Sequence, residues 1–192
     1  MPRRLVTQSE LALLPGYQAD PQRRGYYFDS PDGRCFIMGA MPGDECHDHD
    51  RWGMINISKC EDAIAREDGR PHLVTIDAGL KQNFAAYKFE QSWVDAMTVE
   101  RRDEPVIFVV GADGAHLIDG THRLRRRVQD GCAEARTFLM VPAILKEMRV
   151  RLMRQQPDGE WRQEGGVSDD DLDREILAAE EMAKHVVRPR QS

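Results

Sequence analysis

The chain has no long hydrophobic run, little cysteine and no internal repeat. No apolar stretch approaches the roughly 20 residues that span a bilayer, and the apolar segment at residues 11–14 is too short and interrupted for a signal peptide. The 4 cysteines are scattered without metal-ligand spacing, which is typical of reduced thiols rather than a disulfide framework. These absences exclude membrane-spanning and disulfide-stapled classes, and we expect an intracellular, cytoplasmic protein.

Acidic and basic residues are unevenly distributed along the chain. The net charge is −6, yet residues 157–181 alone carry ten acidic side chains against two arginines. The net charge of −8 on that segment leaves +2 for the rest. Because the field near a basic cluster matters more than the total charge, the weakly basic body can bind nucleic acid locally. Its arginines concentrate at Arg123, Arg125, Arg126, Arg127, Arg136, Arg149, Arg151 and Arg154.

Composition and hydrophobic pattern divide the chain into three parts. Residues 1–24 contain three prolines and predict a loosely ordered N-terminal arm. Residues 25–156 predict a single α+β domain, in which several β-α units share one mixed sheet with flanking helices. Residues 157–192 predict an acidic C-terminal tail with one helix, opened by a capping box at Ser168 and Asp171. The other expected elements are a hairpin at 26–38, a polar loop at 41–52, a strand at 54–57 followed by a helix to about 66, a strand at 72–76, a helical region at 78–99 that breaks near Phe89, and a helix at 142–152.

Residues 117–131 carry the most informative pattern. Apolar strands are predicted at 106–110 and 115–118 around a turn, and a short arginine-rich helix follows. A helix that begins directly after a strand presents backbone N–H groups that attract anions, phosphate above all. Gly120 allows another group to approach the backbone closely. Thr121 offers a hydroxyl at the predicted N-cap, and His122 and Arg123 add a titratable ring and a fork that matches phosphate.

This stretch resembles the signature of the ParB/sulfiredoxin superfamily, in which a strand runs through Asp-Gly-x-His-Arg into a helix that ends in glycine. The matching residues here are Asp119, Gly120, His122, Arg123 and Gly131. The resemblance extends over residues 104–145, and more weakly back to residue 54. It implies a ParB/sulfiredoxin-like fold, a mixed sheet with flanking helices in a single domain.

The chain departs from the two best-known branches of the superfamily, and these differences narrow its expected function. Sulfiredoxins have a cysteine where this chain has Thr121, so sulfinic-acid repair is excluded. Chromosome-segregation members continue into a helix-turn-helix domain, whereas the residues after the domain are acidic here. The remaining branch holds small proteins that inhibit plasmid fertility. It implies an ATPase and nonspecific DNase that blocks conjugative, type IV secretion transfer of a competing plasmid's DNA. Expected partners are ATP, DNA and secretion components, with Mg²⁺ or another divalent cation as cofactor and a position beside the channel at the inner membrane.

The resemblance assigns roles to the motif residues. Arg123 would hold phosphate, Thr121 would contact a phosphate oxygen or the metal, and Asp119 and His122 would position the metal or transfer a proton. A purely structural role stays open for both residues. Asp119 would then be a turn residue that bonds its own backbone, and His122 would donate to a backbone carbonyl. A helical wheel places Leu124 and Val128 on the face toward the sheet. Arg123, Arg126 and Arg127 should then face outward, either as a phosphate grip or as a solvated surface.

Hydrolysis of a phosphate bond also needs a group that positions water. We expect Glu90 in that role with Gln82 and Gln91 as polar helpers, because related folds bring this segment to the phosphate site. Asp95 and Glu100 are rivals, and a solvated helix face explains any one of these residues. The run Cys46, His47, Asp48 and His49 is too tightly spaced for a tetrahedral zinc site and favours a polar loop.

Two other functional classes are compatible with the sequence. A binding module that has kept the fold and lost catalysis would block a secretion component by contact. A small-molecule kinase is the third class, although no substrate pocket is specified. The acidic tail either docks a stripe formed by Leu172 and Ile176 on the body or covers the arginine cluster when DNA is absent.

Overall fold

The computed structural model describes residues 8–11, 13–49, 51–67, 69–85 and 87–186. The fold belongs to the mixed α+β class that the sequence predicts. Clustering of the chain gives two compact units. Among the described residues, one unit, here named the motif unit, comprises residues 64–144 and 172–186. The other, the hairpin unit, comprises residues 8–63 and 145–171. The three-part division with limits at 24/25 and 156/157 stays a prediction.

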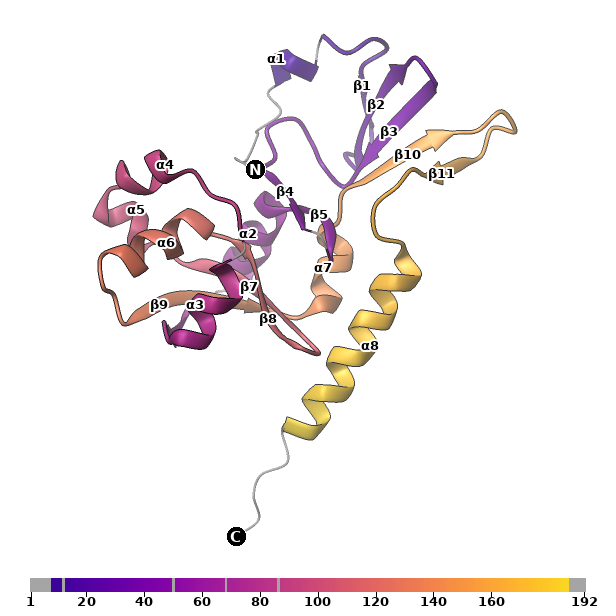
Figure 1. Ribbon diagram of the computed structural model, residues 1–192. Helices are drawn as coiled ribbons and strands as arrows, with labels where there is room; N and C mark the ends of the chain where they lie inside the picture. Colours follow the sequence, from indigo (N-terminus) through magenta and orange to yellow (C-terminus); the bar gives the residue numbers. More distant parts are fainter. Residues whose placement is uncertain (1–7, 12, 50, 68, 86, 187–192) are drawn as a thin grey trace. The chain divides into compact units, whose positions relative to one another are not determined.

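The motif unit is built on a four-stranded mixed sheet of order β6-β9-β7-β8 (Figure 1). The strands are β6 (His72–Thr75), β7 (Val106–Gly111), β8 (Gly114–Asp119) and β9 (Glu134–Met140). Strands β7 and β9 run parallel and the other pairs are antiparallel. The central position of β7 explains its uninterrupted apolar run, since a strand covered on both faces needs no polar alternation.

Helix α6 (Thr121–Gln129) follows β8 and packs on this sheet through Leu124. Leu124 is fully buried in a cluster with core residues of β7 and β8, and Val128 packs against the same cluster. The prediction that these two residues anchor the helix is therefore confirmed. Smaller helices complete the unit: α3 (Ala78–Ala85), α4 (Gln91–Asp95) and α5 (Val99–Asp103).

The predicted end of α6 at Gly131 is also confirmed. Gly131 has a φ of 71°, in the left-handed region that glycine adopts without a Cβ penalty. Its N–H donates to the Val128 carbonyl at 3.1 Å, and the Cys132 N–H donates to the Arg127 carbonyl at 2.9 Å. These two bonds form a Schellman motif, which satisfies carbonyl groups that the helix leaves open.

The hairpin unit contains a five-stranded antiparallel sheet of order β1-β2-β3-β10-β11. Its strands are β1 (Gln18–Ala19), β2 (Gly25–Ser30), β3 (Gly33–Met38), β10 (Arg151–Gln155) and β11 (Trp161–Gln163). Tyr27 and Phe36 are cross-strand partners whose rings stack at 4.4 Å, and the Trp161 ring lies 5.8 Å from Tyr27. A short pair, β4 (Cys46–His49) and β5 (Gly53–Asn56), belongs to the same unit, which begins with α1 (Gln8–Leu11).

Three helices carry the chain from one unit to the other: α2 (Ile57–Arg66), α7 (Pro142–Met148) and α8 (Asp169–Val186). The predicted capping box opens α8, because the Asp171 N–H donates to the Ser168 hydroxyl at 3.1 Å. No helix in the described part of the chain is long and apolar enough to cross a membrane. All four cysteines are free thiols, as predicted.

Three predicted elements are wrong in detail. The expected polar loop at 41–52 contains strand β4, which pairs with β5. The helix expected at 142–152 ends at Met148, because the next residues form β10 beside β3. The region from 157 holds strand β11 in addition to its helix. In each case a strand with few apolar residues is stabilised by pairing with another strand, and the local sequence pattern does not reveal that pairing.

Candidate functional site

Helix α6 begins at the motif, and its N-cap is Gly120 with φ 95° and ψ 24°. The predicted N-cap, Thr121, is the first helical residue instead, so that prediction is wrong by one position. The first bond of the helix runs from the Leu124 N–H to the Gly120 carbonyl at 2.8 Å. The amides of the first turn of α6 precede these helical bonds, and amides at such a position attract anions.

Gly120 is required by packing within the chain. A Cβ built on it would lie 2.5 Å from Val106 Cγ1 and 3.1 Å from Arg123 Nε. The group that approaches this glycine is thus the side chain of Val106 on β7. This contact draws the start of α6 onto the central strand and fixes where the helix points.

Asp119 and Arg123 form a buried ion pair. The Arg123 Nη2 donates to Asp119 Oδ2 at 2.6 Å, and the two residues are only 5 % and 4 % exposed. Arg123 Nη1 also donates to Glu104 Oε2 at 3.3 Å. A pair so enclosed fixes the helix start to the end of β8, because losing either partner would leave a buried charge.

The arginines of α6 do not all face outward. Arg123 and Arg127 are both buried, which contradicts the expectation from the helical wheel. Helix α5 and the segment that follows it pack against this side of α6. Arg127 Nη2 donates to the Glu104 carbonyl at 2.9 Å, and burial lowers the pKa of Arg127. The wheel gave the correct directions, but it could not show that another part of the chain covers that side.

His122 lies at the surface of the same turn. Its Nε2 accepts a hydrogen bond from the Glu90 backbone N–H at 3.1 Å. When the ring is neutral, this bond leaves its proton on Nδ1. The ring centroid lies 5.6 Å from that of Trp93. The His122 ring therefore contacts the α4 segment in two ways, through Nε2 and through the Trp93 ring.

The structure brings one of the predicted water-positioning residues to the motif. Glu90 is the N-cap of α4, its backbone contacts His122 and its side chain is exposed. Gln91 instead donates to Asp95 at 2.7 Å and to Gln129 at 3.2 Å. Gln82 on α3 and Glu100 on α5 are exposed. Glu90 therefore contacts the motif through its backbone N–H, and its carboxylate is exposed at the start of α4.

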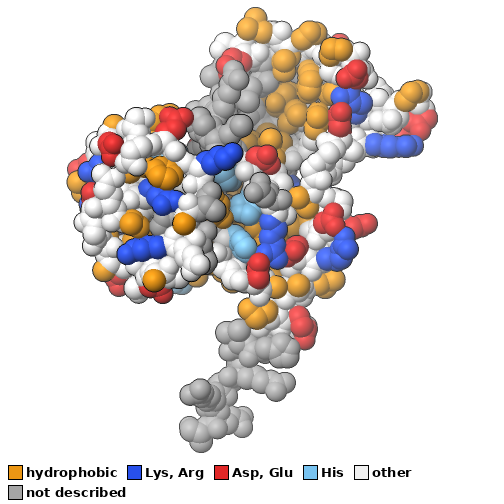
Figure 2. Space-filling view, viewed as in Figure 1, with side chains coloured by type: hydrophobic (Ala, Val, Ile, Leu, Met, Phe, Trp, Pro, Cys, Tyr) orange, Lys and Arg blue, Asp and Glu red, His pale blue; other side chains and the backbone are white. Residues whose placement is uncertain are grey.

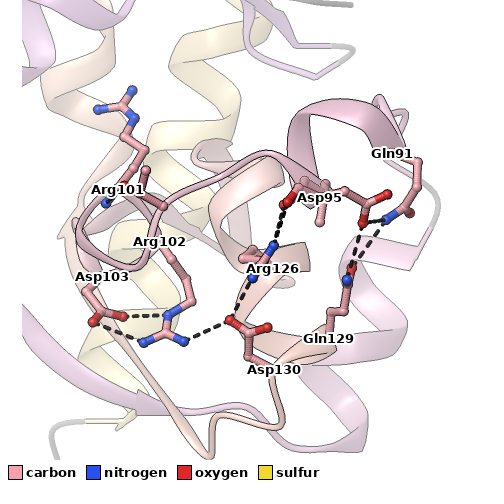
Figure 3. A network of polar contacts seen from close by, with 10 residues as sticks. Gln91, Asp95, Arg101, Arg102, Asp103, Arg126, Gln129 and Asp130 are labelled. Atoms are coloured by element: carbon pink, nitrogen blue, oxygen red, sulfur yellow. Dashed lines mark hydrogen bonds and ion pairs between the residues drawn. The ribbon is translucent and has the colours of Figure 1, made fainter.

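A network of polar contacts joins α6 to α4 and α5 (Figure 3). Arg126 Nη1 donates to the carbonyls of Val94 and Asp95 at 3.1 and 2.9 Å, and its Nε donates to Asp130 at 3.0 Å. Arg102 on α5 donates to the same Asp130 carboxylate at 2.8 Å. Arg126 thus caps the C-terminal end of α4, where a cation is favoured by the open carbonyls.

Acid should weaken this network through Asp130. Hydrogen bonds from Arg102 and then Arg126 hold the pKa of Asp130 below its usual range. A carboxylate with a lowered folded pKa stabilises the protein above its unfolded pKa, and this contribution is lost as pH falls through the folded value. We expect Asp130→Asn to flatten the decline in stability below about pH 4. Thermal melts across the acidic range measure the effect, with the exposed turn residue Asp32→Asn as control. Identical acid limbs for Asp130→Asn and the wild type would contradict the expectation.

Two contacts of the motif helix were not anticipated from the sequence. Arg125 Nη2 donates to the Ala85 carbonyl at 2.9 Å, and its guanidinium carbon lies 4.5 Å from the Phe89 ring centroid. Glu104 contacts Arg123 through its side chain and Arg127 through its carbonyl. His122 and Arg125 are three residues apart on one helix, and this spacing indicates that their side chains lie on the same face.

The carboxylate predicted as a metal ligand, Asp119, is already bound by an arginine. Asp119 already binds Arg123 at 2.6 Å, and the described residues contain no group of three or more histidine, cysteine or acidic side chains suited to a metal ion. In β4 the His47 and His49 rings lie 6.4 Å apart, and burial raises the pKa of Cys46 to about 11.

The charged surface of the motif unit is patchy. Figure 2 shows lysine and arginine side chains as separate patches over the region that holds α4, α5 and α6 in Figure 1. This pattern agrees with the contacts above, since several arginines of α6 turn toward neighbouring backbone and carboxylate groups. In this view the lysine and arginine side chains form no continuous basic surface.

Comparison with known proteins adds no relative. No family model, curated protein or solved structure gives a significant match to the chain. The likeness to the ParB/sulfiredoxin superfamily therefore rests on the motif residues and their strand-turn-strand-helix setting, and it stays a prediction.

Proposed function

We propose that the protein is a nucleotide hydrolase that acts on ATP, with an associated nonspecific DNase activity. The observation that carries this proposal is the start of α6, where first-turn amides and the His122 ring lie directly after β8. A strand that leads into a helix N-terminus is a recurrent phosphate site. ATP and DNA are proposed as the substrates because the motif resembles that of plasmid fertility-inhibition proteins of the Osa type (oncogenic suppression activity).

Each side chain has a part in this proposal. The first-turn amides and the Thr121 hydroxyl would bind phosphate oxygens. His122 would transfer a proton through Nδ1, and the Glu90 carboxylate, exposed beside it, would orient the attacking water. Arg123 and Asp119 would position the helix start through their buried pair. Arg123, Arg126 and Arg127 would bind phosphate directly only by exchanging their present partners. Mg²⁺ would accompany the nucleotide phosphates, as is usual for this ion.

The biological role follows from the same resemblance. The protein would act on DNA that a conjugation or type IV secretion machine delivers, and its activity would suppress transfer from a competing plasmid. The expected place is the cytoplasmic face of the inner membrane beside the channel. ATP, DNA and a secretion component are the proposed partners.

A non-catalytic binding module is the second candidate. The observation that favours it is the buried contact between Asp119 and Arg123, because two motif residues then serve the fold without any reaction. Such a module would keep the superfamily architecture and block a secretion component by contact.

Phosphate release from ATP in the presence of Mg²⁺ separates the two candidates. We expect release from the wild type and a loss of about 100-fold or more in His122→Ala and Glu90→Gln, the size of a general acid–base contribution. Glu134→Gln, an exposed carboxylate on β9, is the matched control and should retain full activity. Parallel lanes with linear DNA test the nuclease. A wild type that releases no phosphate and leaves DNA intact would overturn the hydrolase and favour the binding module.

A further inference from the structure

Two large aromatic side chains are exposed beside the motif helix. Trp93 on α4 is 51 % exposed, and Phe89, which precedes α4, is 37 % exposed. By contrast, Trp52 in the hairpin unit is completely buried. Aromatic rings are among the side chains that gain most from burial. Two of them exposed within one short segment therefore indicate a surface that a ligand covers.

Both rings lie over the same face of α6. The Trp93 ring is 5.6 Å from the His122 ring, inclined at 36°. The Phe89 ring lies 4.5 Å from the guanidinium of Arg125. His122 and Arg125 are three residues apart, so they are neighbours on one face of the helix. The two rings consequently follow this face from its first turn, where the amides of the proposed phosphate site are.

The charges beside the rings suit a nucleic-acid strand. Arg125 and the helix start provide positive potential on the α6 side. On the α4 side Asp95 accepts hydrogen bonds from Gln91 and Gln129, while Glu90 is exposed at the start of the helix. Phosphodiesters would therefore lie along α6, and bases would lie toward the rings of α4 and its preceding segment.

We propose that Trp93 and Phe89 stack unpaired bases of single-stranded DNA next to the start of α6. Bases within a duplex already stack on one another, whereas unpaired bases present a free face to an aromatic ring. Stacking tolerates any base, which agrees with a nuclease that has no sequence preference. This inference rests on the proposed function for its phosphate site, and it makes single-stranded DNA the form of DNA that the site takes.

Binding measured without hydrolysis tests the proposal. An oligothymidine of about 12 nucleotides is titrated in EDTA, and the intrinsic tryptophan fluorescence is followed together with the anisotropy of a labelled strand. We expect quenching in the wild type that disappears in Trp93→Phe, while the affinity of that variant stays close to wild type. Trp93→Ala should lose about tenfold in affinity, the typical loss for one stacked base. Val99→Ala, which alters another exposed apolar residue on α5, is the matched control and should bind like the wild type.

Two further ligands make the result specific. An abasic strand of the same length keeps the phosphates and removes the bases, so it should bind weakly and equally to the wild type and Trp93→Ala. A duplex should also bind without a Trp93 effect. Equal affinity of the wild type and Trp93→Ala for oligothymidine would overturn the proposal, as would an abasic strand that binds as tightly as oligothymidine. Thymidine monophosphate that binds as tightly as the oligomer would also overturn it and assign the rings to a free nucleotide.

A second variant guards against a folding defect, and the two proposals fail separately. Phe89→Leu keeps an apolar side chain but removes the ring, and it should show the same loss for oligothymidine with an unchanged melting curve. Because the titration contains no Mg²⁺ and needs no turnover, an inactive protein that still discriminates oligothymidine from the abasic strand would sustain the stacking surface and overturn only the hydrolase. An active hydrolase that binds oligothymidine and the abasic strand equally would sustain the hydrolase and overturn only the stacking surface.

Discussion

Asp119→Asn should lower the free energy of unfolding by about 3 kcal/mol, the lower end of the cost of breaking a buried ion pair. The substitution keeps the shape of the side chain and removes its charge, so the Arg123 guanidinium, 5 % exposed, would lose its closest carboxylate at 2.6 Å. The lower end of the range applies because Glu104 remains as a second partner of Arg123. Urea denaturation followed by circular dichroism measures the change.

Asp103→Asn is the matched control for this experiment. Asp103 pairs with Arg102 at 2.8 Å but is half exposed, and exposed ion pairs contribute little to stability. We expect a much smaller change from it than from Asp119→Asn. If Asp119→Asn unfolded like the wild type and yet abolished phosphate release, the carboxylate would be a catalytic group, and its role as the clamp between β8 and α6 would be wrong.

Gly120→Ala should destabilise the protein by about 3 kcal/mol through two effects, backbone strain and overpacking. A φ of 95° is disfavoured for any residue with a Cβ, and the new Cβ would lie 2.5 Å from Val106 Cγ1. Gly131→Ala separates these effects, since its φ is 71° and an added Cβ would meet no atom within 4 Å. The loss at Gly131 should be only the backbone cost, about 1 kcal/mol. Denaturation midpoints of both variants provide the comparison.

A double-mutant cycle identifies the cause of the larger effect. Val106→Ala removes the methyl groups that the new Cβ would meet, so Gly120→Ala should cost less in that background than in the wild type. Additive losses would show that contact with Val106 is not what requires the glycine. The cost would then come from the backbone conformation and from the remaining contacts with Val106 Cβ and Arg123 Nε.

The local elements around the motif could be predicted from the sequence, because short-range signals specify them. The apolar run of β7, the turn before Gly114 and the helix-ending Gly131 each act within a few residues. Leu124 and Val128 likewise reveal the buried face of α6 through helical periodicity. Strands β4 and β11 lack such a signal, since they are short and polar. Strand β10 pairs with β3, more than a hundred residues earlier, and continued apolar pattern from α7 conceals it.

The site could be predicted only in part, for a related reason. The motif identified Asp119, His122 and Arg123, and the wheel gave the directions of the α6 side chains. Whether an arginine meets water or backbone depends on which segment lies over it, and that is decided by the packing of α4 and α5. Trp93 and Phe89 were missed because an exposed aromatic ring and a core aromatic ring look the same in a sequence.

The bonds from α6 arginines to main-chain carbonyls have an evolutionary consequence. Arg125 and Arg126 hold the carbonyl groups of Ala85, Val94 and Asp95, and every amino acid offers that same acceptor. Substitutions at the two exposed positions, Ala85 and Asp95, would thus leave the anchor in place as long as the backbone path is kept. The exposed side chains of this segment can accordingly vary, while the arginines that hold its backbone must stay.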